Sequence, residues 1–170
     1  MSAQDKRIVI TGFMCAGKTT VAEALARLLN CRMIDLDYLI SERERRSPHA
    51  LISEEGEGRF RQAEGRALRV VLEMKRARVI ALGGGAWTIE ENRTLIALYD
   101  CFTVWLDAPF ELCWQRINQS EEARPLAPDR ERAHRLYEER RPLYALAGLR
   151  VYATPERSAE ELAAEIISAL

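Results

Sequence analysis

The chain of 170 residues has no long apolar run and almost no net charge. No apolar stretch approaches the roughly 18 residues that a membrane-spanning helix requires. A formal net charge of −1 provides no broad basic surface for nucleic acid or for an anionic membrane. The polar opening residues, MSAQDKR, lack the apolar core of a signal peptide. We therefore expect a cytoplasmic protein that binds neither nucleic acid nor membrane.

Cysteine pairs and metal-ligand spacings are missing as well. The four cysteines are scattered and form no CxxC pair: Cys15, Cys31, Cys101 and Cys113. In a cytoplasmic protein, isolated cysteines of this kind are reduced thiols. We therefore expect no disulfide and no cysteine-bound metal.

Short apolar segments alternate with longer segments of helical periodicity. Five of the short segments are typical of strands: 7–11, 31–37, 78–82, 102–107 and 150–154. Apolar stripes with helical spacing lie at 21–29, 68–75, 112–117, 130–147 and 158–169. The last of them opens with a Ser158/Glu161 capping box. This alternation predicts one α/β domain over residues 1–170, a mostly parallel sheet covered by helices on both faces.

Two segments depart from that alternation. Residues 41–60 are charged and weakly periodic, and residues 117–129 are polar and contain two prolines. Irregular segments of this length are usually surface loops or functional lids. We expect both segments to be irregular, and the motifs within them indicate what they do.

The stretch GFMCAGKTT, residues 12–20, fits the phosphate-loop pattern G-x-x-x-x-G-K-[ST]. It follows a predicted strand and precedes a predicted helix, so backbone N–H groups and the helix N-terminus would surround an anion. Lys18 is expected to reach the β- and γ-phosphates, and the Thr19 hydroxyl to ligate Mg²⁺. The motif predicts a nucleoside triphosphate site formed by Gly12, Cys15, Ala16, Gly17, Lys18, Thr19 and Thr20.

Carboxylates follow two of the predicted strands. Asp35 and Asp37 close the second strand, and in an extended chain they point the same way, toward the ligand-binding edge of the sheet. One could serve the metal, directly or through water, while the other accepts a proton from a substrate hydroxyl. The alternative is a solubilising strand end and a helix cap. Asp107 precedes Ala-Pro and a helix, so we expect it to cap that helix.

Separated arginines and a glycine triplet suggest an anionic substrate. Arg61 lies one helical turn before Glu64, which could hold the guanidinium in place. Arg124 lies in the polar segment, and Arg140 and Arg141 precede a proline. Gly83-Gly84-Gly85 removes side chains at a strand end, where a small ligand must approach the backbone. Any one of these arginines is more often a solvated side chain, but together they suggest that a small acid is phosphorylated.

The motifs GFMCAGKTT, IDLDYLISE, GEGRFRQAE, IALGGGAWT, VWLDAP, ARPL and RRPLY occur in this order. In order and spacing they resemble the shikimate kinase family across nearly the whole chain. The phosphate loop alone is shared with many kinases, whereas the other motifs are more specific as a set. The resemblance implies a nucleoside-monophosphate-kinase-like fold with a five-stranded parallel sheet between two helical layers. It also implies a substrate-binding segment at 35–64 and a short lid near 117–128.

The implied reaction transfers the γ-phosphoryl group of ATP to the 3-hydroxyl of shikimate, with Mg²⁺, in aromatic amino acid biosynthesis. By the same resemblance, Asp37 would contact the ring hydroxyls near the proton to be removed. Arg61 and Arg140 would hold the shikimate carboxylate, and Gly83–Gly85 would lie against the substrate.

The remaining roles implied by the resemblance lie on the nucleotide side. Arg124 would move in with the lid to meet the substrate and the transferring phosphate, and together with Lys18 and Asp37 it would form the catalytic set. Arg116 would stack on adenine, and Asp35 would orient the water shell of the metal. We expect such an enzyme to act as a monomer on a small-molecule substrate.

Two positions depart from the family pattern. Cys15 stands where the family usually has glycine, and a positive φ there would cost a non-glycine residue about 1 kcal/mol. Ile52 stands where the family commonly has phenylalanine, so one apolar wall of the pocket is reduced. Neither change removes a charged group that the reaction needs.

Other interpretations remain open from the sequence. A related kinase for gluconate or for a nucleoside monophosphate shares the phosphate loop, although the short lid and the arginines favour a carboxylate substrate. A phosphate-loop protein that binds nucleotide without turnover is a second alternative, supported only by Cys15 and Ile52.

Overall fold

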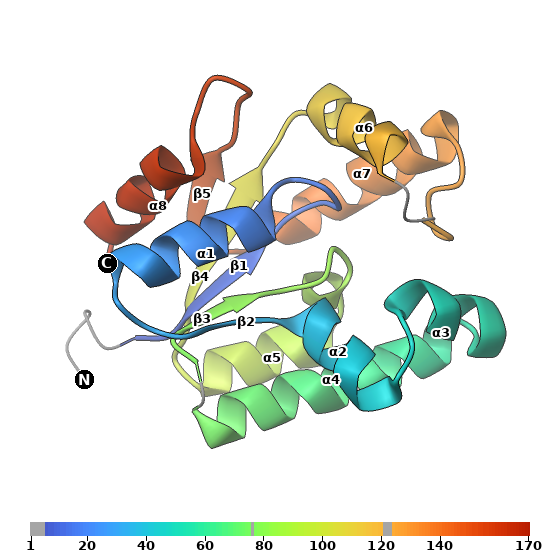
Figure 1. The fold of residues 1–170 in the computed structure, drawn as a ribbon, viewed down its shortest axis with the longest axis horizontal. Helices are drawn as coiled ribbons and strands as arrows, with labels where there is room; N and C mark the ends of the chain where they lie inside the picture. The colour runs from blue at the N-terminus through green and yellow to red at the C-terminus, as the bar shows by residue number, and fades with distance from the viewer. Residues whose placement is uncertain (1–5, 76, 121–123) are drawn as a thin grey trace.

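Five parallel strands organise the chain, for which the computed structural model describes residues 6–75, 77–120 and 124–170. The strands are β1 Ile8–Thr11, β2 Met33–Asp35, β3 Val79–Ala81, β4 Phe102–Asp107 and β5 Leu149–Tyr152, in the order β2-β3-β1-β4-β5 (Figure 1). The registers include Ile10 opposite Ala81 on one side of β1 and Ile10 opposite Val104 on the other. Because β1 is the central strand, the loop that follows it lies at the middle of the edge formed by the carboxyl ends of the strands.

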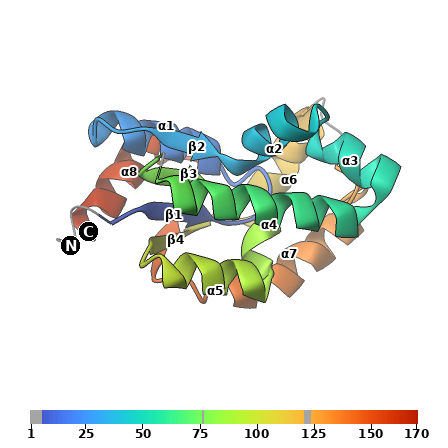
Figure 2. The same ribbon diagram turned by 90° about the horizontal axis from the view of Figure 1, so that it is seen from below.

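Helices cover both faces of this sheet. α1 Lys18–Leu28 and α8 Ala159–Ser168 pack together on one face. α5 Glu90–Leu98 and α7 Arg130–Tyr144 lie on the other, with α4 Glu57–Met74 packed beside α5 (Figure 2). The predicted fold class, helices around a five-stranded parallel sheet, is confirmed. The capping box that begins α8 is confirmed too, since the Ser158 hydroxyl accepts from the Glu161 amide at 3.2 Å.

The core lies on both faces of the three central strands. Ile8, Val9 and Ile10 of β1 are fully buried, as are Ile80 of β3 and Leu106 of β4. Strands that are buried on both faces are apolar almost throughout, which is why these three were the clearest in the sequence. Within the described residues, no helix has both the length and the apolar character needed to cross a membrane, and the four cysteines are free thiols.

The expectation that residues 41–60 are irregular is wrong, because this segment is helical. α2 Leu36–Glu44, α3 Pro48–Glu55 and the start of α4 follow one another closely. The Ser47 side chain caps α3 by accepting from the Ala50 amide at 3.1 Å, and Gly56, at φ 89°, separates α3 from α4. α2 and α3 pack mainly on α4, and α2 also contacts β2. Only Leu36, Ile40 and Leu51 of these two helices are buried, so their apolar periodicity is faint.

The polar segment 117–129 is irregular at residues 124–129, as predicted, whereas residues 117–119 belong to the end of a helix. α6 runs over Phe110–Gln119, and residues 124–129 form turns before Asp129 caps α7 by accepting from the Arg132 amide at 2.8 Å. Residues 121–123 of the predicted lid lie outside the described residues.

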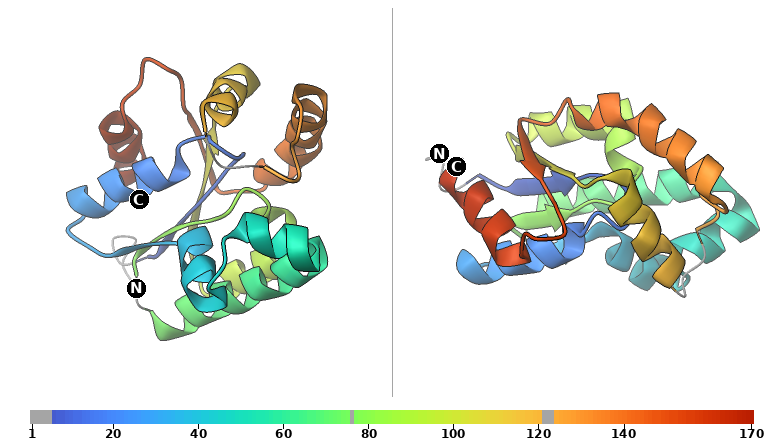
Figure 3. Two further views of the ribbon diagram at one scale, coloured as in Figure 1. Left: turned by 45° about the vertical axis from the view of Figure 1, so that its right-hand side comes forward. Right: turned by 90° about the horizontal axis from the view of Figure 1, so that it is seen from above.

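The segments that carry the predicted site residues gather at one edge of the sheet. α2 and α3 lie on one side of the loop that follows β1, and α6 and α7 lie on the other (Figure 3). This is the edge formed by the carboxyl ends of the strands, where open α/β sheets bind their ligands.

Candidate active site

The phosphate loop connects β1 to α1, and both of its pattern glycines are required by the backbone. Gly12 has φ 146°, and a Cβ added there would lie 2.5 Å from the Leu106 carbonyl oxygen of β4. Gly17 has φ 99° and directly precedes the first residue of α1. L-residues rarely adopt these conformations, so glycine is needed for the loop to turn beneath a ligand.

Lys18 and Thr19 lie at the start of α1, at the base of this loop. Lys18 is 9% exposed, and its Nζ donates to the Phe13 carbonyl at 2.8 Å, across the loop. Burial lowers the pKa of Lys18, and the nearby negative charge of Asp37 opposes that shift. The Thr19 hydroxyl donates to Oδ2 of Asp35 at 2.5 Å. The loop therefore presents the ammonium group of Lys18. Beside it lie two oxygens suited to a metal ion, one from the Thr19 hydroxyl and one from the Asp35 carboxylate.

The expectation that Asp35 and Asp37 project side by side from a strand is wrong. β2 ends at Asp35, which caps α2 by accepting from the Tyr38 amide at 3.1 Å, so the helix-cap alternative describes Asp35. Asp37 lies in the first turn of α2 instead. The capping carboxylate starts a helix immediately, so the chain is not extended at Asp37. Both side chains nevertheless line the same cleft.

Asp37 is packed beneath the glycine triplet. A Cβ on Gly83 would lie 2.5 Å from Oδ1 of Asp37, so that position has no room for a side chain. This oxygen is buried and has no hydrogen-bond partner among the described residues. Burial and the neighbouring charge of Asp35 raise the pKa of Asp37, while Lys18 lowers it. A buried acceptor without a partner is costly unless a ligand supplies a donor.

Arg61 is held by two carboxylates on α4. Its Nη1 donates to the buried Glu64 carboxylate at 2.9 and 3.1 Å, and its Nη2 donates to Glu57 at 3.0 Å. Burial raises the pKa of Glu64 to about 7, although the Arg61 charge opposes this rise. A Cβ on Gly85 would collide with the Arg61 guanidinium. The geometry thus contains the Arg61–Glu64 contact that the helical spacing predicted.

Arg140 reaches the same place from α7. It is 7% exposed, and a Cβ on Gly84 would lie 3.7 Å from its Nη1 and 3.2 Å from the Met14 amide nitrogen. The Tyr144 hydroxyl, one turn further along α7, donates to the Gly84 carbonyl. Burial raises the pKa of Tyr144 to about 12, so this hydroxyl keeps its proton.

Arg61, Arg140, Arg124, Asp37, Glu64 and the glycine triplet line one cavity of about 100 Å³, which we call the acid pocket. Its remaining walls come from Met14, Pro48, His49, Ile52, Phe60, Pro125 and Leu126. Of these walls, sequence reasoning found only Ile52. Most of the others are apolar residues in a helix or turn, which are usually core, and His49 is a lone histidine, so nothing marked them as pocket walls.

A larger cleft of about 1580 Å³ follows the phosphate loop and meets the acid pocket at Asp37, Arg124 and Gly84. Arg116 of α6 lies at its rim and donates to the Cys15 carbonyl at 3.1 Å. Thr154 and Arg157, which follow β5, line the same cleft and were missed, because the sequence carries no motif there.

Cys15 is a residue of the phosphate loop that contacts two arginines, Arg116 and Arg124. Its φ is 59°, so the strained conformation considered for this non-glycine residue is present. Its sulfur lies 3.8 Å from Nη2 of Arg124, which belongs to the segment before α7. The segment with Arg124 therefore contacts the phosphate loop directly.

Asp107 does not cap α6, contrary to expectation. It is 6% exposed and its carboxylate binds Arg141 and Arg150, while α6 begins after Pro109 without a side-chain cap. A buried carboxylate needs paired cations, and these come from α7 and β5, far away in sequence.

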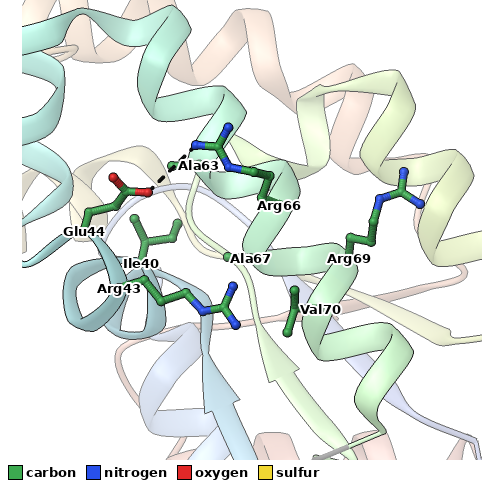
Figure 4. A pocket seen from close by; sticks show the side chains of 8 residues that line it. All are labelled: Ile40, Arg43, Glu44, Ala63, Arg66, Ala67, Arg69 and Val70. Atoms are coloured by element: carbon green, nitrogen blue, oxygen red, sulfur yellow. Dashed lines mark ion pairs between the residues drawn. The ribbon is translucent and has the colours of Figure 1, made fainter.

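A third hollow, of about 570 Å³, lies apart from these residues between α2 and α4 (Figure 4). Ile40 and Ala67 form part of its apolar floor, and Arg66 at its rim pairs with Glu44 at 3.9 Å. It contains none of the predicted site residues. The acid pocket and the neighbouring cleft are therefore the candidate active site.

Comparison with known proteins identifies the chain's relatives. A sequence model described as "Shikimate kinase" matches residues 14–170. The chain is 36% identical to a curated shikimate kinase of Bacillus licheniformis over 169 residues, covering 98% of this chain and 94% of the relative. It is also 36% identical to one from Ruegeria pomeroyi over 172 residues, covering 99% and 87%.

A solved structure gives the same result. The shikimate kinase from Acinetobacter baumannii in complex with shikimate matches with a TM-score of 0.87 and 32% identity, covering 96% of this chain and 92% of that one. The chain belongs to the shikimate kinase family.

Proposed function

We propose that this member of the shikimate kinase family transfers the γ-phosphoryl group of ATP to the 3-hydroxyl of shikimate, yielding shikimate 3-phosphate and ADP. The observation that carries the proposal is the acid pocket, which adjoins the phosphate-loop cleft. It is lined by Arg61, Arg140 and an Asp37 oxygen that has no hydrogen-bond partner among the described residues. Two guanidinium groups suit a carboxylate, and a buried carboxylate oxygen suits a hydroxyl.

Substrate binding follows from these contacts. The Arg61 and Arg140 guanidinium groups bind the carboxylate, and Glu64 keeps Arg61 oriented. Gly83–Gly85 allow the ring to lie against the backbone, because any side chain there would meet Asp37, Met14 or Arg61. Ile52 and Phe60 form apolar walls, and the smaller Ile52 leaves this wall shorter than a phenylalanine would.

Phosphoryl transfer needs a proton acceptor and positive charge around the moving group. Asp37 accepts the hydroxyl proton as the hydroxyl oxygen bonds to the γ-phosphorus and the bond from that phosphorus to the leaving ADP oxygen breaks. Lys18 and Arg124 stabilise the charge on the transferring group from either side. The rise in the Asp37 pKa with burial makes the carboxylate a better base than an exposed aspartate.

The residues present fit ATP and Mg²⁺. The nucleotide would occupy the phosphate-loop cleft, where Arg116 and the segment that includes Thr154 would be available to the adenine. Mg²⁺ prefers oxygen ligands and is usually held by one or two protein groups plus substrate phosphates. Thr19 and Asp35, 2.5 Å apart at their oxygens, would hold it directly or through water. When bound, the metal neutralises phosphate charge.

We further propose the division of labour within the chain. Residues 35–64, which include α2 and α3, form the substrate-binding segment, and residues near 117–128 form the lid that carries Arg124. The chain acts as a monomer in the cytoplasm, where free cysteines such as these stay reduced. Light scattering during size-exclusion chromatography tests the oligomeric state.

The first experiment measures ADP release by the purified protein with Mg-ATP alone, and with shikimate, gluconate or AMP added. Strong stimulation by shikimate alone is the expected result. Stimulation by gluconate or AMP instead would overturn the substrate assignment, and ATP binding without any stimulated release would overturn the kinase activity. Lys18→Met serves as the control, because it removes the ammonium group but none of the residues of the acid pocket.

A further inference from the structure

The buried carboxylate of Asp107 lies outside both the acid pocket and the nucleotide cleft, at the carboxyl end of β4. Arg150 donates to Oδ2 through Nε at 2.9 Å and through Nη2 at 2.6 Å. Arg141 donates from Nη1 to Oδ1 at 3.1 Å. One carboxylate therefore binds two arginines that come from different elements, β5 and α7.

Aromatic rings hold these two arginines in place. The Arg150 guanidinium lies 4.5 Å from the centre of the Trp105 ring, and that of Arg141 lies 5.3 Å from the same ring. Arg141 also donates to the Tyr137 hydroxyl at 2.6 Å, which in turn donates to the Ala108 carbonyl at 2.9 Å. Partly desolvated cation–π and charge-assisted contacts are worth more than exposed ones.

The position of Arg141 on α7 connects this cluster to the acid pocket. Its chain neighbour Arg140 enters the acid pocket, and Pro142 follows inside the helix. Proline removes one backbone hydrogen bond and disturbs the preceding turn. The turn that carries Arg140 is therefore weaker than an ordinary helical turn, and side-chain contacts must define its position.

We infer that Asp107 and Arg141 are positioning residues, which fix α7 against the end of β4 so that Arg140 projects into the acid pocket. This inference rests on the proposed function for the role of Arg140. Arg150 differs from Arg141 because it lies on β5: it balances the charge of Asp107 without tying down α7.

That difference supplies a matched pair of variants. Arg141→Met leaves Asp107 paired with Arg150, and Arg150→Met leaves it paired with Arg141, so neither substitution strands the buried charge. Asp107→Asn is less useful, because it removes the shared partner of both arginines and threatens folding. Arg141→Lys keeps the charge and can form one hydrogen bond to Asp107.

Steady-state kinetics and hydrogen exchange test the inference together. We expect Arg141→Met to raise the KM for shikimate about tenfold, a loss typical of coupled neighbouring groups, with kcat and the KM for ATP within about twofold. Arg141→Lys should recover part of that loss, and Arg150→Met should stay within about twofold in every constant. Amide exchange around Arg140 should accelerate in Arg141→Met but not in Arg150→Met.

The outcomes separate cleanly. Equal KM changes in the two Met variants, or none in Arg141→Met, would overturn the positioning role, even if both lower the midpoint of thermal unfolding. Unchanged exchange in α7 would overturn the tether itself. If the parent protein shows no shikimate-stimulated ADP release, the proposed function fails instead, and the exchange comparison still decides whether Arg141 tethers α7.

Discussion

The nucleotide cleft is formed around one consecutive stretch, residues 12–20, whereas the acid pocket takes its charged groups from α2, α4, α7 and the segment before α7. The first region would contact phosphates mainly with backbone groups, and its shape depends on Gly12 and Gly17. The second depends on side chains that carry charge. A backbone cradle tolerates changes in side chains such as Cys15, while a cavity of paired charges does not. The two regions should therefore respond differently to substitution.

Asp37→Asn tests the boundary between the two regions and should have the largest effect. We expect kcat to fall on the order of 10² to 10⁴-fold, because the amide cannot accept the hydroxyl proton. ATP binding should persist, since the phosphate loop is untouched. Nucleotide titration beside steady-state kinetics checks both values, and parallel loss of turnover and ATP affinity would contradict the assigned role. Asp35→Asn is the counterpart, with its effect expected on the Mg-ATP side.

Arg61→Lys tests whether the acid pocket depends on geometry or only on charge. A lysine cannot reproduce the planar fork, so the KM for shikimate should rise about 10 to 100-fold while the KM for ATP stays within about twofold. Arg66→Lys, on the exposed side of the same helix, is the control. Kinetics equal to the parent in Arg61→Lys would show that the carboxylate binds elsewhere.

Glu64 should make substrate binding depend on pH. Its pKa is raised by burial to about 7, so protonation below that value weakens its ion pair with Arg61. We expect the KM for shikimate to rise a few-fold as pH falls from about 8 to about 6, and Glu64→Gln to remove this dependence. Glu57→Gln, at an exposed partner of the same arginine, should leave it in place. An unchanged pH profile in Glu64→Gln would exclude this origin.

The same shift affects stability. Because the native pKa of Glu64 lies above the ordinary value of 4.5, the native state binds more protons than the unfolded state between these values. The contribution of Glu64 to the free energy of unfolding therefore falls as pH rises from 4.5 to about 7. As pH rises across this range, the melting temperature of Glu64→Gln should therefore increase relative to that of the parent.

Cys15→Gly should have the smallest effect, because it changes a side chain in the phosphate loop, whose shape depends on the backbone. Glycine relieves about 1 kcal/mol of strain at φ 59°, and its freedom in the unfolded chain offsets most of this gain. We expect the melting temperature to shift by about 2 °C or less and the KM for ATP to stay within about twofold. Asn30→Gly, at φ 46° away from the site, is the control. A large kinetic change in Cys15→Gly, without one in Asn30→Gly, would mean that the contact between Cys15 and Arg124 has a role in turnover.

Local patterns determined most of what could be predicted. The phosphate loop, the strand and helix alternation and the Ser158 capping box each depend on residues within a few positions of one another. The central strands are buried on both faces and are therefore apolar throughout, so each could be predicted from its own sequence alone. In contrast, α2 and α3 pack mainly on α4, and their periodicity was too weak to show them.

Tertiary structure alone decided how distant groups meet. Asp35 became a cap and Asp37 a helical residue, because the strand ended two residues earlier than its pattern suggested. Asp107 pairs with Arg141 and Arg150, and no local spacing records this contact. The sequence by itself determined which chemical groups the site contains and the local elements that carry them. Packing between distant segments decided where these groups point, how deeply they are buried and how their pKa values shift. Each of these properties depends on distances in space, which the separation of residues along the chain does not set.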